Sequence, residues 1–420
     1  MLLGHSAFSV PVCTNILKRT MTTAPFPRAV KASFWRGGTS KGVFFNISDL
    51  PKWFQSALST GKPPEAATLK NMEQFFAAVL GSPDPYGRQL NGMGGGISSL
   101  SKAMVVGPSS QSDANVDYTF FQIGVKDGKL DMAGNCGNLT SVVGPFALTC
   151  DLYHQEPAKD GQRVPDGGNE TVTLRMRNTN TAKIIESTFQ ATGFDGKWEY
   201  QELGTCSIDG VPGTGSTITL SFLHPGGAKT GKALPTGNPI DNIEVGDQIV
   251  RASLIDVSNP GVFVDGRGIG WKIDATPDKL NANQALLEKL EAIRKRGTEM
   301  MGLDPNISSI PKIVLLFPAK SEGLDISCQA LSMEQAHKAV PVTLALNLGV
   351  ACKMEGTLPH ALSKHLHPSN TVIGHPSGTL EVGAAIENGE ITGAKLIRTA
   401  RCHMEGYVNT LRSGYDSRDR

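Results

Sequence analysis

Short apolar runs that follow glycine-rich turns recur along the chain, and they predict a structure rich in strands. Residues 43–45 (VFF) follow the turn at residues 36–42, and residues 262–264 (VFV) follow a similar turn at residues 255–261. Apolar runs of this length, bounded by Gly, Pro, Asn and Ser, are typical of strands joined by tight turns. The same signal therefore occurs once in each half of the chain.

Two apolar helices are predicted, one in each half. The first begins at residues 135–138 (NCGN) and continues through Ala147, and the second begins at residues 333–337 (MEQAH) and continues through Val350. Both start in a setting of polar or small residues, as helices commonly do. Residues 283–301 predict a further, amphipathic helix, whose leucine stripe faces the protein and whose charged residues face solvent.

This pattern predicts an α/β (α+β) fold made of two related halves, each with strands packed about an apolar helix. A chain of 420 residues exceeds the size at which a single core usually keeps growing, which also favours two halves. Residues 225–239, rich in Gly and Pro, are suited to cross from one half to the other. We expect an N-terminal extension, a first half, a second half and a tail at residues 1–27, 28–250, 251–410 and 411–420.

Composition and charge exclude several classes of partner. Lys and Arg number 40 against 39 Asp and Glu, so no net charge favours nucleic acid, and no apolar run is long enough to span a membrane. The seven cysteines contain no Cys-x-x-Cys pair and no histidine at a zinc-ligand spacing. We therefore expect neither a disulfide framework nor a metal site, and the cysteines fit a reducing compartment.

The N-terminus carries a weaker signal about location. Residues 1–48 contain no Asp or Glu, while Lys and Arg recur and Ser and Thr are common. This composition is typical of a mitochondrial transit peptide, which predicts a mitochondrial protein. Pro11 interrupts the amphipathic helix that such a peptide needs, so a cytoplasmic protein with an ordinary tail is the alternative.

Residues 226–233 (GGAKTGKA) nearly match a phosphate-binding P-loop. That motif requires Ser or Thr directly after its lysine to hold magnesium, and here Lys232 is followed by Ala233, Leu234 and Pro235. The departure argues against nucleotide binding at this loop.

Cys136 is the clearest candidate for a catalytic residue, because it lies at the predicted start of the first apolar helix. A thiol in this position experiences the positive end of the helix dipole and unpaired N–H groups, which lower a thiol pKa and also bind anions. Such a cysteine can act as an acid or a base near neutral pH. A lone cysteine is usually buried and inert, but the surrounding residues Gly134, Asn135, Gly137 and Asn138 contribute little to a core, which favours a functional role.

Three further segments hold candidate ligand-binding groups, each with a plainer alternative. Lys102 ends a glycine-rich run over residues 91–101, where it can neutralise a carboxylate or take a proton, or lie solvated beside a hairpin. The small residues of the turn at 374–379 can donate to another carboxylate or form an ordinary hairpin. His337 holds the place in the second half that Cys136 holds in the first, although a histidine there is often a cap or a core residue.

Taken in order, these motifs resemble those of the 2-methylaconitate cis-trans isomerases. The resemblance covers residues 28–410 and rests on the segments 36–42, 81–86, 91–102, 134–138, 235–238 and 374–378. It implies the fold of diaminopimelate epimerase, with two pseudo-symmetric halves, each a mixed β-sheet wrapped around a central helix. It also implies an active site in the cleft between the halves.

The same resemblance implies that Lys102 and Cys136 form the catalytic acid/base pair and that Ser40 binds substrate. Where diaminopimelate epimerase has a second cysteine, this chain has His337, which argues against a two-cysteine racemase. No metal and no cofactor is implied. We expect the substrate-binding groups to be Gly38, Thr39, Ser40, Asn91, Ser101, Gly137, Asn138, His337, Ser377, Gly378 and Thr379.

The predicted function is therefore that of a cofactor-independent isomerase of a small unsaturated tricarboxylic acid. It would convert 2-methyl-trans-aconitate to 2-methyl-cis-aconitate, as in propionate breakdown, or interconvert cis- and trans-aconitate, by proton abstraction and reprotonation. An amino-acid racemase or epimerase and a non-catalytic partner of an aconitase-like dehydratase are the alternatives. The order of proton transfer between Lys102 and Cys136, coupling to such a dehydratase, and assembly as a homodimer are left open by the sequence.

Overall fold

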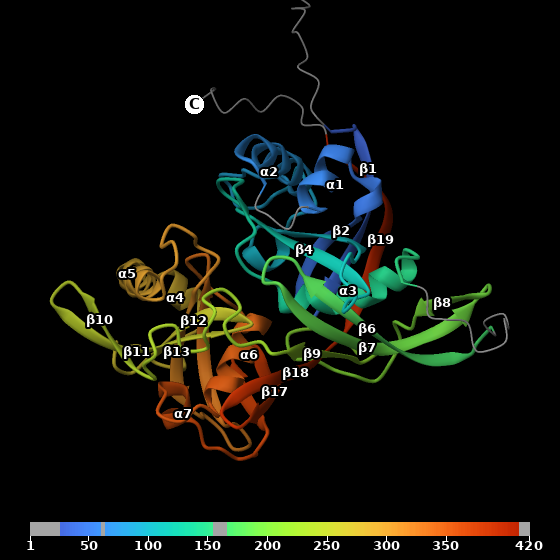
Figure 1. Cartoon of the computed structure of the whole chain (residues 1–420). Helices are drawn as coiled ribbons and strands as arrows, with labels where there is room; N and C mark the ends of the chain where they lie inside the picture. The colour runs from blue at the N-terminus through green and yellow to red at the C-terminus, as the bar shows by residue number, and fades with distance from the viewer. Residues whose placement is uncertain (1–25, 60–63, 154–165, 411–420) are drawn as a thin grey trace, which may run out of the picture.

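The computed structural model describes residues 26–59, 64–153 and 166–410. The described residues of the first half form a mixed sheet with three α-helices (Figure 1). Its elements are β1 (Ala29–Gly37), β2 (Ser40–Asn46), α1 (Lys52–Ser59), α2 (Ala66–Leu80), β3 (Lys102–Pro108), β4 (Val116–Ile123), β5 (Leu130–Asp131), α3 (Gly137–Thr149), β6 (Asn169–Asn178), β7 (Lys183–Phe194), β8 (Lys197–Tyr200) and β9 (Ile218–Leu223).

The second half continues the sheet and carries four helices. Its elements are β10 (Asp241–Val245), β11 (Gln248–Val257), β12 (Asn259–Asp265), α4 (Pro277–Asn281), α5 (Gln284–Met300), β13 (Lys312–Pro318), β14 (Ile326–Ser332), β15 (Gln335–Ala336), α6 (Val342–Ala351), α7 (Leu358–Leu362), β16 (Asn370–His375), β17 (Gly378–Glu387), β18 (Glu390–Arg398) and β19 (Ala400–Asn409).

The strand pairing repeats between the halves, which confirms the predicted duplication. In the first half β1–β2 is antiparallel, β2–β3 parallel, β3–β4 antiparallel and β4–β6 parallel. In the second half β11–β12, β12–β13, β13–β14 and β14–β16 follow the same sequence of directions. One central helix follows the fourth strand of each repeat, α3 in the first and α6 in the second.

Two strands join the halves more closely than the sequence indicates. β9 pairs with β18, and β19 returns to pair with β1 in the first half (Figure 1). The expected boundary at residue 250 falls inside β11, because β10 and β11 form one hairpin. Residues 400–409, near the end of the expected second half, form β19 and pair with β1 of the first half.

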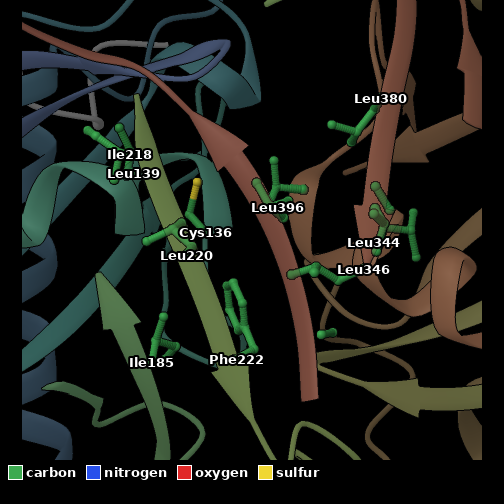
Figure 2. Close-up of a cluster of buried hydrophobic side chains, with 14 of the residues drawn as sticks. Cys136, Leu139, Ile185, Ile218, Leu220, Phe222, Leu344, Leu346, Leu380 and Leu396 are labelled. Carbon is green, nitrogen blue, oxygen red and sulfur yellow. The ribbon is translucent and has the colours of Figure 1, made fainter. Parts of the chain in front are cut away.

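Both central helices are buried along their lengths, as their continuous apolar sequences require. The main core contains residues of both halves, and Figure 2 shows Cys136 among apolar side chains that include Leu220 of β9 and Leu396 of β18. The starts of the two helices are in contact. A Cβ atom on Gly137 would lie 2.4 Å from Cγ1 of Val342, so only glycine permits this approach.

Two of the three predicted helices begin where the sequence places them. The side chain of Cys136 caps no backbone group at the start of α3, and Asn283 caps α5 by accepting a hydrogen bond from the N–H of Leu286. The third prediction was wrong in its start. α6 begins at Val342 after Pro341, because residues 335–336 pair with β14 as β15.

The P-loop-like segment binds an internal carboxylate. The backbone N–H groups of Lys229 and Thr230 both donate to Oδ2 of Asp256 at 2.8 Å, and the Thr230 hydroxyl donates to the same atom at 2.9 Å. Donors that would face a phosphate in a P-loop therefore face a side chain of β11.

The expectation of mitochondrial import rests on an N-terminal extension of which residues 1–25 lie outside the described residues, as does the tail at 411–420. None of the helices in the described ranges is long and apolar enough to cross a membrane.

Candidate active site

A small cavity of about 40 Å³ lies between the starts of α3 and α6. The first half contributes Ser40, Lys102, Cys136, Gly137 and Asn138 to its wall, all of which the sequence predicts as site residues. The second half contributes His337, also predicted, together with groups that the sequence analysis did not single out. These are Ser309, Lys312, Ser332, Pro341, Val342 and Thr343.

Cys136 is the N-cap residue of α3, and its residue surface is 9% exposed. The helix start has no side-chain cap, so the N–H groups at Gly137 and Asn138 stay available to a ligand. The start of α6 also lacks a side-chain cap. Two helix N-termini, each with a positive dipole end, thus face one cavity.

Lys102 is the first residue of β3, and it is 8% exposed. Its ammonium group donates to the side-chain oxygen of Gln122 and lies 5.1 Å from the ring centre of Phe120. Burial lowers the pKa of Lys102, and the nearby Cys136 and Asp131 oppose that shift. A lysine in this environment loses a proton more readily than a solvated one.

Lys312 is a second lysine in the cavity, and the sequence analysis missed it. It is the first residue of β13, the strand that corresponds to β3 in the duplicated fold. Its ammonium group donates to the carbonyl of Ser309 at 2.5 Å. Desolvation and the neighbouring charge of Lys102 lower the pKa of Lys312 to about 8.

A repeated pattern could have revealed Lys312. Residues 102–108 (KAMVVGP) and 312–318 (KIVLLFP) both begin with lysine, continue with small or apolar residues and end with proline. Aligning the two halves on this pattern places Lys312 opposite Lys102. The turns and helices on which the predicted duplication rests lie outside these two strands.

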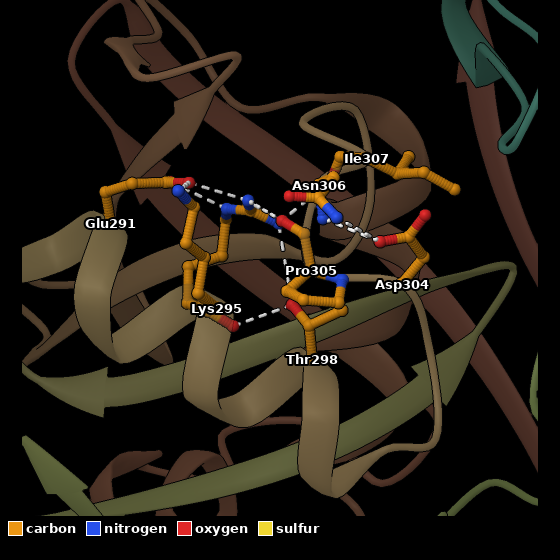
Figure 3. A network of polar contacts seen from close by, with 8 residues as sticks. Glu291, Lys295, Thr298, Asp304, Pro305, Asn306 and Ile307 are labelled. Carbon is orange, nitrogen blue, oxygen red and sulfur yellow. Dashed lines mark hydrogen bonds and ion pairs between the residues drawn. The ribbon is translucent and has the colours of Figure 1, made fainter.

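The loop before Lys312 is held by an arginine of α5. Figure 3 shows the region around Glu291 and residues 304–307. Arg294 donates to the carbonyls of Pro305 and Ile307, each at 3.0 Å, and forms an ion pair with Glu291 at 2.7 Å. Because Arg294 is only 4% exposed, this network fixes the chain that leads into Lys312.

His337 precedes α6 and is neutral in this structure. Its Nδ1 accepts a hydrogen bond from the N–H of Ala339 at 3.0 Å, so the proton of the neutral ring is on Nε2. Burial lowers the pKa of His337 to about 4, and the charges of Lys102 and Lys312 contribute to the decrease. His337 can therefore donate a hydrogen bond into the cavity near neutral pH.

Asn138 connects the first turn of α3 to the predicted binding turn at residues 38–40. Its Nδ2 donates to the hydroxyls of Thr39 at 3.0 Å and Ser40 at 3.4 Å, and its Oδ1 accepts from Nε of Arg398 at 3.2 Å. Gly38 has a φ of +50°, and a Cβ atom there would lie 2.1 Å from Oδ1 of Asn138. The glycine is therefore required for this contact.

Asn259 joins the starts of the two central helices and was not predicted as a site residue. Its Nδ2 donates to the carbonyl of Asn135 at 2.9 Å and to the hydroxyl of Thr343 at 3.0 Å. Its Oδ1 accepts from the N–H of Asn135 at 3.1 Å. The sequence marks the turn at residues 255–261 but gives no signal for this long-range contact.

Four predicted binding residues of the first half do not line the cavity, namely Gly38, Thr39, Asn91 and Ser101. Ser101 is fully buried, and its hydroxyl donates to the carbonyl of Ile123 at 2.8 Å and accepts from Gln89 at 2.8 Å. Asn91 is exposed in the glycine-rich run. A Cβ atom on Gly94 would lie 2.2 Å from the Gln89 side chain, so that glycine permits packing rather than access by a ligand.

The turn at Ser377, Gly378 and Thr379 also lies outside this cavity, and it binds a carboxylate of the chain itself. Oδ2 of Asp209 accepts from the N–H of Thr379 at 2.6 Å and from its hydroxyl at 3.1 Å. The Ser377 hydroxyl donates to the carbonyl of Lys338. Thr379 instead lines a larger neighbouring cavity.

The electrostatic character of the small cavity is strongly one-sided. Lys102 and Lys312 line it, whereas no Asp or Glu is among its lining residues. Within the described ranges, no group of three or more His, Cys, Asp and Glu side chains is arranged to hold a metal ion. The arrangement suits an anionic ligand held next to a thiol and an amine.

Comparison with known proteins agrees with this geometry. The chain is 36% identical to the 2-methyl-aconitate isomerase of Shewanella oneidensis, over 92% of this chain and 99% of that protein. Its structure is similar to the crystal structure of methylitaconate-delta-isomerase, with a TM-score of 0.67 and 31% identity over 92% and 98% of the two chains. A hydroxyproline epimerase from Agrobacterium vitis shares the fold at 12% identity, with a TM-score of 0.52 over 91% and 93% of the two chains.

These similarities place the fold in the diaminopimelate-epimerase-like class, as the sequence predicts. Residues 28–411 of the 420-residue chain match the family described as PrpF protein. The chain belongs to the PrpF family.

Proposed function

We propose that this protein isomerises a small unsaturated tricarboxylic acid, either 2-methyl-trans-aconitate or aconitate, without a cofactor. The single observation that carries the proposal is the cavity in which Cys136, Lys102 and Lys312 meet with no lining carboxylate. Relatives named 2-methyl-aconitate isomerase and 3-methylitaconate isomerase, the latter 32% identical, support a substrate of this class.

The reaction requires removal of a weakly acidic C–H proton from a carbon next to the double bond. The electron pair left behind is delocalised through the double bond onto a carboxylate. Reprotonation at the other end moves the double bond, and reprotonation at the original carbon after rotation exchanges cis and trans isomers. The proton count is balanced in both cases, because one base takes a proton and one acid returns it.

Cys136 and Lys102 take the two proton-transfer roles in this proposal. Both line the cavity, and the lowered pKa of Lys102 brings its amine closer to the range in which it can exchange a proton. The charge that develops on the carboxylate is stabilised by Lys312 and by the N–H groups at the start of α3. His337 adds a neutral hydrogen-bond donor.

A racemase of an amino acid is the competing enzymatic function, and the second half argues against it. Such an enzyme needs a second acid/base opposite the first, at the start of α6. That position is Pro341 here, which has no acid/base side chain, and His337, which lines the cavity just before it, is neutral. The proposal also includes two protein partners. One is an aconitase-like dehydratase to which the reaction is coupled, and the other is a second copy of this chain in a homodimer.

The experiment that tests the proposal is incubation in deuterated water with trans-aconitate, 2-methyl-trans-aconitate and proline as separate substrates. Deuterium in an isomerised aconitate supports the proposed reaction. Deuterium in proline would assign a racemase instead. No deuterium in any of the three, from protein shown to be folded, would assign a non-catalytic role.

A further inference from the structure

A larger cavity of about 510 Å³ lies beside the catalytic one and is not explained by the proposed chemistry. Ala339 and Val340 line the larger cavity, and the next residues, Pro341 and Val342, line the smaller one. Cavities that enclose small molecules commonly measure about 300–1,000 Å³. The larger cavity is therefore of ligand size, whereas the catalytic cavity alone is not.

Arg398 is the most unusual group in the wall of the larger cavity. It is 6% exposed, its Nε donates to Asn138, and its Nη1 donates to the carbonyl of Ile397 at 2.7 Å. No carboxylate of the described residues forms an ion pair with it. A buried guanidinium without a counter-charge is costly, and a bound carboxylate would remove that cost.

Neutral hydrogen-bonding groups lie in the same wall as Arg398. His375 is buried, and its Nδ1 accepts from the N–H of Ser377 at 3.2 Å, so the neutral ring carries its proton on Nε2. Burial and the charge of Arg398 lower the pKa of His375 to about 4. The hydroxyl-bearing residues Thr39 and Thr379 line the same cavity.

Two acidic residues also line this cavity, and both have other partners. Asp209 accepts from Thr379, as described above, and Glu381 accepts from Nδ2 of Asn370 at 2.6 Å. Lys395 lies in the wall as an exposed residue. Neither acid forms an ion pair with Arg398.

We infer that the larger cavity is a carboxylate-binding subsite in which Arg398 pairs with the distal carboxylate of a substrate whose reacting carbon lies at Cys136. Asn138 joins the two regions, because it accepts from Arg398 and donates to Ser40 in the catalytic cavity. This inference rests on the proposed function, since it names Arg398 as the group that binds the third carboxylate of the tricarboxylic acid. Arg398 would then determine preference for tricarboxylates over dicarboxylates.

The test measures binding and does not depend on turnover. Calorimetry with propane-1,2,3-tricarboxylate and with succinate would compare the wild-type protein with Arg398→Gln and with Lys126→Gln, which removes an exposed charge outside both cavities. We expect Arg398→Gln to weaken tricarboxylate binding by about 30-fold, the effect of losing a charged hydrogen-bonded pair. Succinate binding by Arg398→Gln and tricarboxylate binding by Lys126→Gln should change by less than about threefold.

A second variant covers the case in which Arg398→Gln does not fold. Thr219 is partly exposed in the wall of the larger cavity, and Thr219→Phe should weaken tricarboxylate binding while sparing succinate, because the ring would occupy part of that cavity. Equal loss for both acids in Arg398→Gln, or unchanged tricarboxylate binding in Thr219→Phe, would overturn the inference. If the protein binds the tricarboxylate through Arg398 but isomerises neither aconitate nor 2-methylaconitate, the subsite is supported and the proposed function is rejected. Failure of the inference can therefore be distinguished from failure of the proposed function.

Discussion

The two halves present matching lysines to the cavity but different groups at the starts of their central helices. Lys102 and Lys312 begin the corresponding strands β3 and β13. α3 begins after Cys136, whereas α6 begins after Pro341, which has neither a thiol nor a backbone N–H. The duplicated scaffold therefore supplies positive charge from both sides, and only the first half supplies a thiol. The lysine positions are therefore symmetric between the halves, and the position of the thiol is not.

Removal of the thiol, which only the first half supplies, is expected to have the largest effect on turnover. Cys136→Ser should lower kcat by about 10⁴-fold, because serine has a similar shape but is a far poorer acid or base near neutral pH. Steady-state kinetics with the aconitate isomers measure this. Cys150→Ser is the matched control, since Cys150 is the C-cap at the other end of the same helix, and it should retain full turnover. More than a tenth of wild-type turnover in Cys136→Ser would remove Cys136 from the mechanism.

The two lysines should respond differently to substitution by a permanent cation. Lys102→Arg should lower kcat by about 10²- to 10⁴-fold if Lys102 exchanges a proton, because guanidinium stays protonated at any workable pH. A raised KM with near-normal kcat would instead show that Lys102 only binds a carboxylate. In that case His337 or Lys312 would have to take the second acid/base role.

Lys312 is expected to bind rather than to transfer a proton. Lys312→Met should raise KM by about 30-fold and change kcat much less, while Lys320→Met, an exposed lysine just beyond β13, should change neither. Because the pKa of Lys312 is about 8, its ammonium is lost as pH rises through that value, and kcat/KM should fall there. Lys312→Arg should shift this fall to higher pH. An unchanged profile in Lys312→Arg would contradict the binding role.

Substitution of His337 tests the second half with a smaller expected effect. His337→Gln keeps an N–H donor, so kcat should fall by about tenfold or less. The ring is already neutral between pH 5 and 8, because its pKa is about 4, and the variant should therefore show the same pH profile as the wild type in that range. A profile that loses an inflection between pH 5 and 8 would show that His337 titrates during turnover.

Removal of metal ions is expected to have no effect on turnover. Prolonged treatment with a chelator should leave kcat unchanged, because the described residues contain no cluster of metal ligands. Loss of activity that is restored by added metal would require a different mechanism.

Local signals in the sequence predicted most of the scaffold and about half of the site. The N-terminal thiol of α3 and the helix α5 could be predicted because turn residues, caps and apolar periodicity are encoded within a few neighbouring positions. Lys312 and Asn259 were missed because their roles arise from pairings between distant strands and helices. The start of α6 was misplaced because β15 pairs with β14, a tertiary effect that overrides the local helix signal.

The turn at residues 377–379 shows the limit of predicting a binding site from donors alone. Its small residues do bind a carboxylate, as their sequence indicates, but the carboxylate belongs to Asp209. The same holds for the P-loop-like segment and Asp256. A sequence shows which backbone N–H groups are accessible to an anion, but not whether a distant acidic side chain reaches them first.

The return of β19 to β1 has a consequence for biosynthesis. All nine residues of β1 pair with residues 400–409, so this edge of the first half is completed only after nearly the whole chain has been made. During synthesis from the N-terminus, β1 would have an unpaired edge while about 360 residues are added, at roughly 5–20 residues per second. An open edge of this kind can pair with another nascent chain. Truncation before residue 400 should therefore yield aggregated protein rather than an isolated first half.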